Sequence, residues 1–94
     1  MQLIPLTQNY SFAIERYEKL RVRLMIYKNG ELRVCRKESA YKLNQFLTQD
    51  EAKAFKGRLQ LFKHHDDIAV EVKGQPVGTI SVADMRACIA ASAI

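Results

Sequence analysis

Apolar and polar residues alternate in two stretches of the chain, and each stretch has a turn in its middle. The first, about 20–37, contains "LRVRLMIYK" and "ELRVCRK" on either side of Asn29-Gly30. The second, about 68–82, contains "IAVEV" and "PVGTISV" on either side of Gly74-Gln75. A two-residue period around Gly-containing turns is typical of β-hairpins. The sequence therefore predicts two antiparallel hairpins.

The turn of the first hairpin decides which of its side chains face the core. A two-residue loop, Asn29-Gly30, would put Arg33 and Lys37 on the apolar face, where an unpaired cation is costly to bury. A three-residue loop, Lys28 to Gly30 with a G1 bulge, moves both to the opposite face and leaves only Arg36 as a misfit, near enough to the open end to reach water. The predicted pairs are Ile26 with Leu32, Leu24 with Val34 and Val22 with Arg36. The sequence thus favours the three-residue loop.

The second hairpin requires an irregularity of its own. Gly74-Gln75 suits a type II′ turn, which has Gly first, and this turn pairs Val77 with Val72. Ile80 then lies on the wrong face of the strand. A bulge at Gly78-Thr79 is predicted because it returns Ile80 to the core face.

Helical spacing of apolar residues occurs in three segments, about 82–92, 49–63 and 11–19. Ser81 and Asp84 form a cap pattern before the first, and Thr48 with Glu51 forms a capping box before the second. The apolar faces are Met85, Cys88, Ile89 and Ser92 in 82–92, and Ala52, Phe55, Leu59 and Phe62 in 49–63. A continuous helix over 49–63 is preferred, but a helix ending at Gly57 leaves 58–63 open as a strand.

Two further segments have alternatives. Residues 11–19 suit a short helix capped by Ser11, or they run directly into the next strand. The segment "ESAYKLNQF" has no firm period and is interpreted as an extended connector or a short strand. These elements together predict an α+β fold in a single domain, 1–94. An antiparallel sheet is built from the two hairpins, and the helices cover one face.

Charge is distributed unevenly along this basic chain, which has a net charge of +5. Residues 1–63 hold thirteen Lys and Arg against six Asp and Glu, while residues 64–94 hold two against four. Such asymmetry indicates an anionic partner for one face, although basic residues also serve solubility alone. No apolar run approaches the roughly 20 residues of a membrane span, and two cysteines make no disulfide framework. We therefore expect a cytoplasmic protein without membrane attachment.

The candidate site is the polar face of the first hairpin, which carries Arg21, Arg23, Arg33, Lys37 and Tyr27. In the predicted register Arg21 lies opposite Lys37, and like charges placed opposite each other destabilise a sheet. Phosphate-binding cations beside a stacking aromatic would give this pair a function in nucleic-acid binding. The alternative is an edge hairpin whose cations discourage aggregation.

Other chemistry has little support in the sequence. The run "HHDD", His64 to Asp67, offers two ligands where zinc needs three or four, and it suits a helix end followed by a turn. Cys35 and Cys88 lack a nucleophile signature, and the isolated glycines form no phosphate loop. We predict no catalytic residue, metal or cofactor, and hence no enzyme.

Two functions follow as hypotheses. The first is a small accessory protein that binds nucleic acid non-specifically through the cationic hairpin face. The alternative is a protein-interaction module, a regulator, inhibitor or assembly subunit, that presents the hairpin or the C-terminal helix to a larger protein or nucleoprotein complex. The Ala-rich helix at 82–92 also suggests contact with a second copy in a homodimer.

Overall fold

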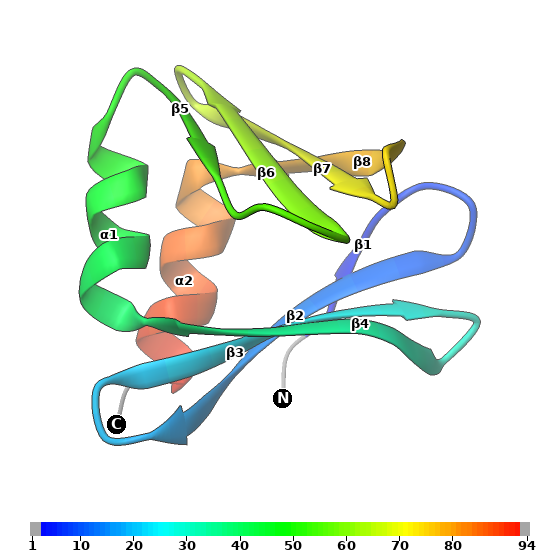
Figure 1. Cartoon of the computed structure of the whole chain (residues 1–94), viewed down its shortest axis with the longest axis horizontal. Coiled ribbons are helices and arrows are strands. Elements are labelled where there is room, and N and C mark those ends of the chain that lie inside the picture. The colour runs from blue at the N-terminus through cyan, green and yellow to red at the C-terminus, as the bar shows by residue number, and fades with distance from the viewer. Residues whose placement is uncertain (1–2, 93–94) are drawn as a thin grey trace.

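The computed structural model describes residues 3–92, which form two four-stranded antiparallel sheets and two helices (Figure 1). The first sheet has the order β1 (Ile4–Pro5), β2 (Tyr10–Glu18), β3 (Arg21–Lys28), β4 (Glu31–Ser39). The second has the order β5 (Glu51–Ala54), β6 (Leu59–His64), β7 (Asp67–Val72), β8 (Gln75–Ser81). Helix α1 (Ala40–Thr48) links the sheets, and α2 (Val82–Ser92) follows the second. The predicted α+β class is confirmed, but the two hairpins lie in different sheets.

The two sheets share one apolar core. Phe12, Leu24 and Ile26 from the first sheet and Leu61 and Val70 from the second are fully buried in it. In Figure 1 the sheets lie one above the other, and both helices stand at the same end of the molecule. Because α1 and α2 also contribute buried side chains, they close the core at that end.

The first hairpin forms as predicted, but its predicted three-residue turn is wrong. Lys28 pairs with Glu31 around a two-residue loop, in which Asn29 and Gly30 have φ of 52° and 82°. Positive φ at both positions is the hallmark of a type I′ turn. A bulge then places one extra residue, Arg33, on β4, so that the register is set by the bulge and not by the turn. The observed pairs are Tyr27 with Leu32, Ile26 with Val34, Leu24 with Arg36, Arg23 with Lys37 and Arg21 with Ser39.

The second hairpin differs from its prediction in the same way. Its turn is Lys73-Gly74, with φ of 53° and 79°, and not Gly74-Gln75. The bulge adds Val77 to β8, one residue before the predicted position. The predicted Val77–Val72 pair is therefore wrong, although Ile80 does reach the core.

Residues 11–19 do not form a helix, because β2 occupies the middle of the first sheet, between β1 and β3. Phe12, Ala13 and Ile14 are all buried. A central strand buried on both faces has consecutive apolar residues, which also match part of a helical pattern. Backbone pairing of β2 with β3 shows that this segment is a strand and not a helix.

The segment 40–64 was predicted least well. Helix α1 occupies 40–48, where a connector or strand was expected, and Ser39 caps it by accepting a hydrogen bond from Lys42 N at 3.1 Å. The predicted helix over 49–63 is wrong and is replaced by β5, a loop and β6. Thr48 ends α1 instead of capping a new helix. The alternative, a strand "RLQLF", is confirmed from Leu59 on by β6, and Arg58 lies in the loop before it. Cross-strand packing, with Leu61 opposite Val70, overrides the helical spacing.

Helix α2 is confirmed at its predicted bounds, Val82–Ser92. Asp84 N donates to Ser81 Oγ at 3.0 Å, as the cap pattern requires. Met85, Cys88 and Ile89 are buried, and the helix packs against β2 and β8. It therefore ties the two sheets together.

Candidate functional site

Two of the predicted cations on the first hairpin already have acidic partners. Arg21 Nε lies 3.6 Å from Glu18, and Arg23 donates a hydrogen bond to Glu15. This hydrogen bond raises the pKa of Arg23. The predicted Arg21–Lys37 pair is wrong because the bulge brings Lys37 opposite Arg23. Glu15, on β2, lies opposite Arg23, on β3. Its carboxylate therefore offsets the repulsion between Arg23 and Lys37.

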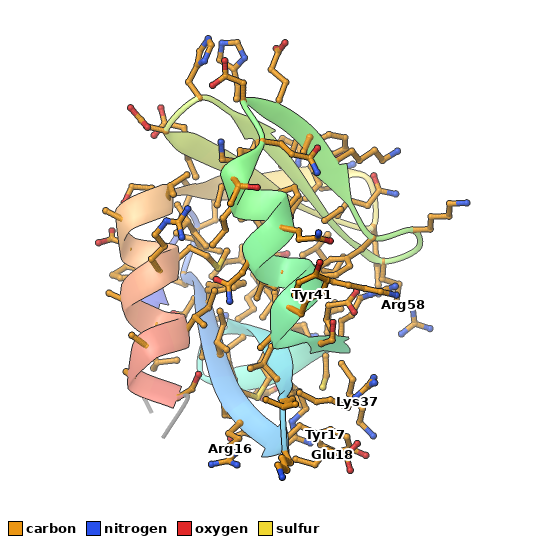
Figure 2. All side chains as sticks on the ribbon, turned by 90° about the vertical axis from the view of Figure 1, so that its left-hand side faces the viewer. Arg16, Tyr17, Glu18, Lys37, Tyr41 and Arg58 are labelled. Carbon is orange, nitrogen blue, oxygen red and sulfur yellow. The ribbon has the colours of Figure 1, made fainter. Side chains whose placement is uncertain are left out.

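Lys37 and Tyr27 make local contacts as well. Lys37 Nζ donates to Tyr17 Oη at 2.9 Å and lies 4.1 Å from the centre of that ring. Tyr27 Oη donates to Met25 Sδ at 3.4 Å. We call Arg21, Arg23, Tyr27 and Lys37 the outer hairpin face. Figure 2 shows Tyr17 and Lys37 close together, apart from Arg58. Much of the charge of this face is thus engaged within the molecule.

A groove runs along the outer edge of β4, between the two sheets. Strand β4 pairs only with β3, and among residues 3–92 no backbone hydrogen bond joins its other edge to a strand. The groove has a volume of about 550 Å³ and is lined by Arg33, Val34, Cys35, Arg36, Lys37, Arg58 and Leu59. The edge is therefore open to a ligand.

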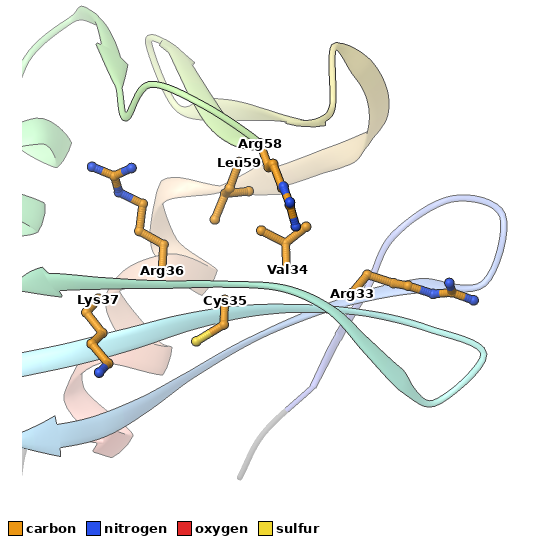
Figure 3. Close-up of a pocket in the computed structure, with 7 residues that line it drawn as sticks. All are labelled: Arg33, Val34, Cys35, Arg36, Lys37, Arg58 and Leu59. Atoms are coloured by element: carbon orange, nitrogen blue, oxygen red, sulfur yellow. The ribbon is translucent and has the colours of Figure 1, made fainter.

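Strand alternation sorts the side chains of β4 around this groove. Figure 3 shows Val34 and Arg36 directed from β4 toward the second sheet, where Arg58 and Leu59 face them. Cys35 and Lys37 point to the opposite side of β4, and Arg33 extends away toward the hairpin turn. Arg36 from β4 and Arg58 from the loop before β6 thus line the same groove.

Arg36 is the misfit that the sequence predicted, and the open edge explains how it is accommodated. It lies opposite Leu24 on the core face, yet its Nη1 reaches the groove and donates to Lys56 O at 3.0 Å. Its guanidinium carbon lies 4.5 Å from the centre of the Phe55 ring. The ring and the carbonyl together hold the guanidinium plane in place.

A second basic groove continues from the first. It has a volume of about 270 Å³ and is lined by Tyr10, Lys28, Arg33, Val72, Lys73 and Gln75. Lys73 N donates to Arg58 O at 2.7 Å, which places this turn beside the first groove. We define the basic seam as Lys28, Arg33, Arg36, Arg58 and Lys73. No Asp or Glu is among the described residues that line the two grooves.

The outermost of these cations has one acidic neighbour. Arg33 Nη2 lies 3.8 Å from Glu31, in a pair that is largely exposed. An exposed pair at this distance contributes little and is readily exchanged for another anion.

Sequence reasoning therefore found Arg33 and missed most of the basic seam. Arg58 was missed because the predicted helix placed it among the residues of one long element. Lys28 and Lys73 were missed because they lie next to turns in different hairpins. A strand starting after Gly57, the alternative we did not prefer, was the signal that would have placed Arg58 near a sheet edge.

The remaining candidates have structural roles. His64 Nδ1 lies 2.9 Å from Glu51 and His65 Nδ1 lies 3.5 Å from Asp50, so they join the β6–β7 turn to the start of β5 and do not end a helix. In the part of the chain that the structure describes, no group of three or more His, Cys, Asp or Glu is placed to hold a metal ion. Cys35 is exposed, and Cys88 is buried.

No helix of the described residues is long and apolar enough to cross a membrane. The homodimer through α2 stays a prediction. In comparisons with protein-family models, curated proteins and solved structures, no match to this chain was found.

Proposed function

We propose that this protein binds nucleic acid through the basic seam, by contacts to phosphates and without reading base sequence. The observation that carries the proposal is the convergence of six cations, the five of the basic seam and Lys37, on two connected grooves that no carboxylate lines among the described residues. A groove lined by charge of one sign concentrates the electric field and attracts a polyanion. The outer hairpin face is a weaker candidate, because Arg23 is hydrogen-bonded to Glu15 and Lys37 to Tyr17.

Salt dependence tests the proposal directly. If each cation of the basic seam neutralises one phosphate, the log–log slope of affinity against salt is about −4.5 for a duplex and about −3.5 for a single strand. The measurement is fluorescence anisotropy of labelled DNA and RNA probes over a series of salt concentrations. Absence of binding to every probe at low salt would refute the proposal.

A pair of matched double variants locates the site. Arg33→Gln with Arg58→Gln removes two charges from the basic seam, and Arg21→Gln with Arg23→Gln removes from the outer hairpin face two that line neither groove. We expect the first double variant to reduce the magnitude of the slope on a single strand by about 1.4 and the second to change it little. The opposite result would assign binding to the outer hairpin face. Circular dichroism of both variants checks that each is folded.

A second candidate function is supported by the unpaired edge of β4. A protein partner can add an extended segment to an open sheet edge through backbone hydrogen bonds. Beside the basic seam, this segment would have to be acidic. Displacement of the nucleic-acid probe by polyglutamate shows only that the seam binds polyanions. Tighter binding of an acidic protein than of any nucleic acid would favour this second function.

A further inference from the structure

The Arg36–Phe55 pair has the properties of a stacking platform. The guanidinium is held against the Phe55 ring at 4.5 Å and by a hydrogen bond from Nη1 to Lys56 O at 3.0 Å. Its Nε is buried and has no hydrogen-bond partner within the described chain. The guanidinium plane is therefore fixed by Phe55 and Lys56, while its buried Nε is not accessible to a ligand.

The backbone of Phe55 supports a role for this pair in binding a ligand. Phe55 has a φ of 72°, in the left-handed region that bulky residues rarely adopt. Such strained residues are concentrated at ligand-binding sites, where the surrounding structure holds them. The strain at Phe55 coincides with the position that places its ring under the Arg36 guanidinium.

We infer that the basic seam takes a single strand in preference to a duplex, with one base stacked on the Arg36 guanidinium. This inference rests on the proposed function and specifies its substrate class. Bases that have left the double helix stack on arginine planes and aromatic rings, whereas the bases of an intact duplex stack on each other. The unpaired edge of β4 offers backbone donors and acceptors to the base edges that only a single strand leaves unpaired.

The shape of the site also favours a single strand. Arg36 and Arg58 both line one groove, so a thin chain lying in the groove can contact both (Figure 3). A protein that reads a duplex usually inserts a helix or a two-stranded ribbon into the major groove, which is about 12 Å wide. The basic seam is concave, so its cations would meet only the outside of a duplex.

The first test compares strands of the same sequence. We expect a single strand of about 16 nucleotides to bind at least tenfold more tightly than its duplex at the same low salt concentration. Equal or tighter binding of the duplex would overturn the inference and leave the proposed function standing. Absence of binding to both would refute the proposed function as well.

The second test examines the platform with a matched control. Phe62 on β6 also lies beneath a cation, with Lys53 Nζ 5.4 Å from its ring centre. Lys53 lines neither groove of the basic seam, whereas Arg36, above Phe55, lines the first. We expect Phe55→Leu to weaken single-strand binding about five- to tenfold, which is the usual effect of losing one stacked base, and Phe62→Leu to change it less than twofold. Equal effects of the two variants would overturn the platform.

A spectroscopic readout separates stacking from loss of structure. The chain has no tryptophan, so Phe55→Trp introduces a single fluorophore at the platform. We expect a single strand to quench its fluorescence and a duplex at the same degree of saturation to leave it nearly unchanged. Phe62→Trp, the control, should respond to neither. Quenching by a saturating duplex to the same extent would contradict the inference.

Discussion

The two sheets meet along two seams that differ in almost every respect. On one side, Thr7 N and Thr7 Oγ1 both donate to Val77 O, at 2.9 and 2.8 Å, and Gly78 packs against Leu6. We call these four residues the closed seam. On the other side, the edge of β4 faces β6 across the groove of the basic seam (Figure 1). One seam is joined by hydrogen bonds and packing, and the other is left open and charged.

The difference shows how each seam protects an exposed sheet edge. An unpaired strand edge invites pairing with other chains unless something covers it or charge repels them. The loop through Leu6 and Thr7 covers the edge of β8, whereas Arg33, Arg36 and Lys37 protect the edge of β4 by charge. We therefore expect substitutions in the closed seam to change stability, and those in the basic seam to change binding.

The largest effect on stability should come from Gly78→Ala. Gly78 has a φ of 145°, and an added Cβ would lie 2.9 Å from Leu6 Cβ and 3.2 Å from Thr7 N. Backbone strain and overpacking each cost about 1 to 3 kcal/mol, so we expect a total loss of roughly 2 to 6 kcal/mol. Urea unfolding followed by circular dichroism measures it.

Gly57→Ala is the matched control for this prediction. Gly57 also has a positive φ, 99°, but a Cβ there would have no atom within 4 Å. Its cost should be limited to backbone strain, about 1 to 3 kcal/mol. Equal losses of stability in the two variants would show that the contact between Gly78 and Leu6 does not hold the closed seam together.

Thr7→Val should have the next largest effect. It removes the hydroxyl donor to Val77 O and keeps both the shape of the side chain and the backbone bond from Thr7 N. We expect the free energy of unfolding to fall by about 1 kcal/mol. Thr79→Val is the control, because Thr79 lies on β8, the strand that contains Val77, and is exposed. An effect of Thr79→Val as large as that of Thr7→Val would contradict the role of this hydrogen bond.

The sequence predicted those elements whose pattern fits only one structure. Alternation over about 20–37 and 68–82 defined both hairpins, and the Ser81 cap defined α2 at its observed bounds. The turns were misassigned because a three-residue loop and a two-residue loop followed by a bulge restore the same parity. Both hairpins use the second solution, with left-handed residues at both turn positions. Parity alone does not distinguish the two.

The basic seam was largely hidden from the sequence for a related reason. Its cations come from β3, β4, the loop before β6 and the turn after β7, so no local period connects them. The apolar spacing of 49–63 fits a helix, but β6 gains more by pairing with β7 and burying Leu59 and Leu61. Of the predicted site residues, Arg33 and Lys37 line the first groove, and the Lys37 side chain points away from the second sheet (Figure 3).

A substitution in the basic seam should lower the free energy of unfolding less than those in the closed seam. Arg58→Gln removes a cation from a cluster of like charge, and no ion pair to Arg58 is found among the described residues. We expect unfolding free energy to change by less than about 0.5 kcal/mol, while nucleic-acid affinity falls. Urea unfolding and anisotropy on the same preparation compare the two. A loss of stability as large as that of Thr7→Val would show that the basic seam also holds the sheets together.

The smallest expected effect on stability comes from the thiol of Cys88, and it depends on pH only in the alkaline range. Burial raises the pKa of the Cys88 thiol on α2, which packs against β2 and β8. Above about pH 8.5 the unfolded chain loses this proton while the folded chain keeps it, so fewer protons are bound in the unfolded state and stability falls as pH rises. Below that pH both states keep the proton, and the thiol contributes no pH dependence.

Cys88→Ala should therefore flatten the alkaline decline in stability, even though its cavity lowers stability at every pH. Cys35→Ala is the control, because Cys35 is exposed on β4 whereas Cys88 is buried. Urea midpoints at neutral pH and between about pH 8.5 and 10 separate the slope from the constant loss. If stability declines as steeply with pH in Cys88→Ala as in Cys35→Ala, the thiol of Cys88 is not the group that lowers stability at alkaline pH.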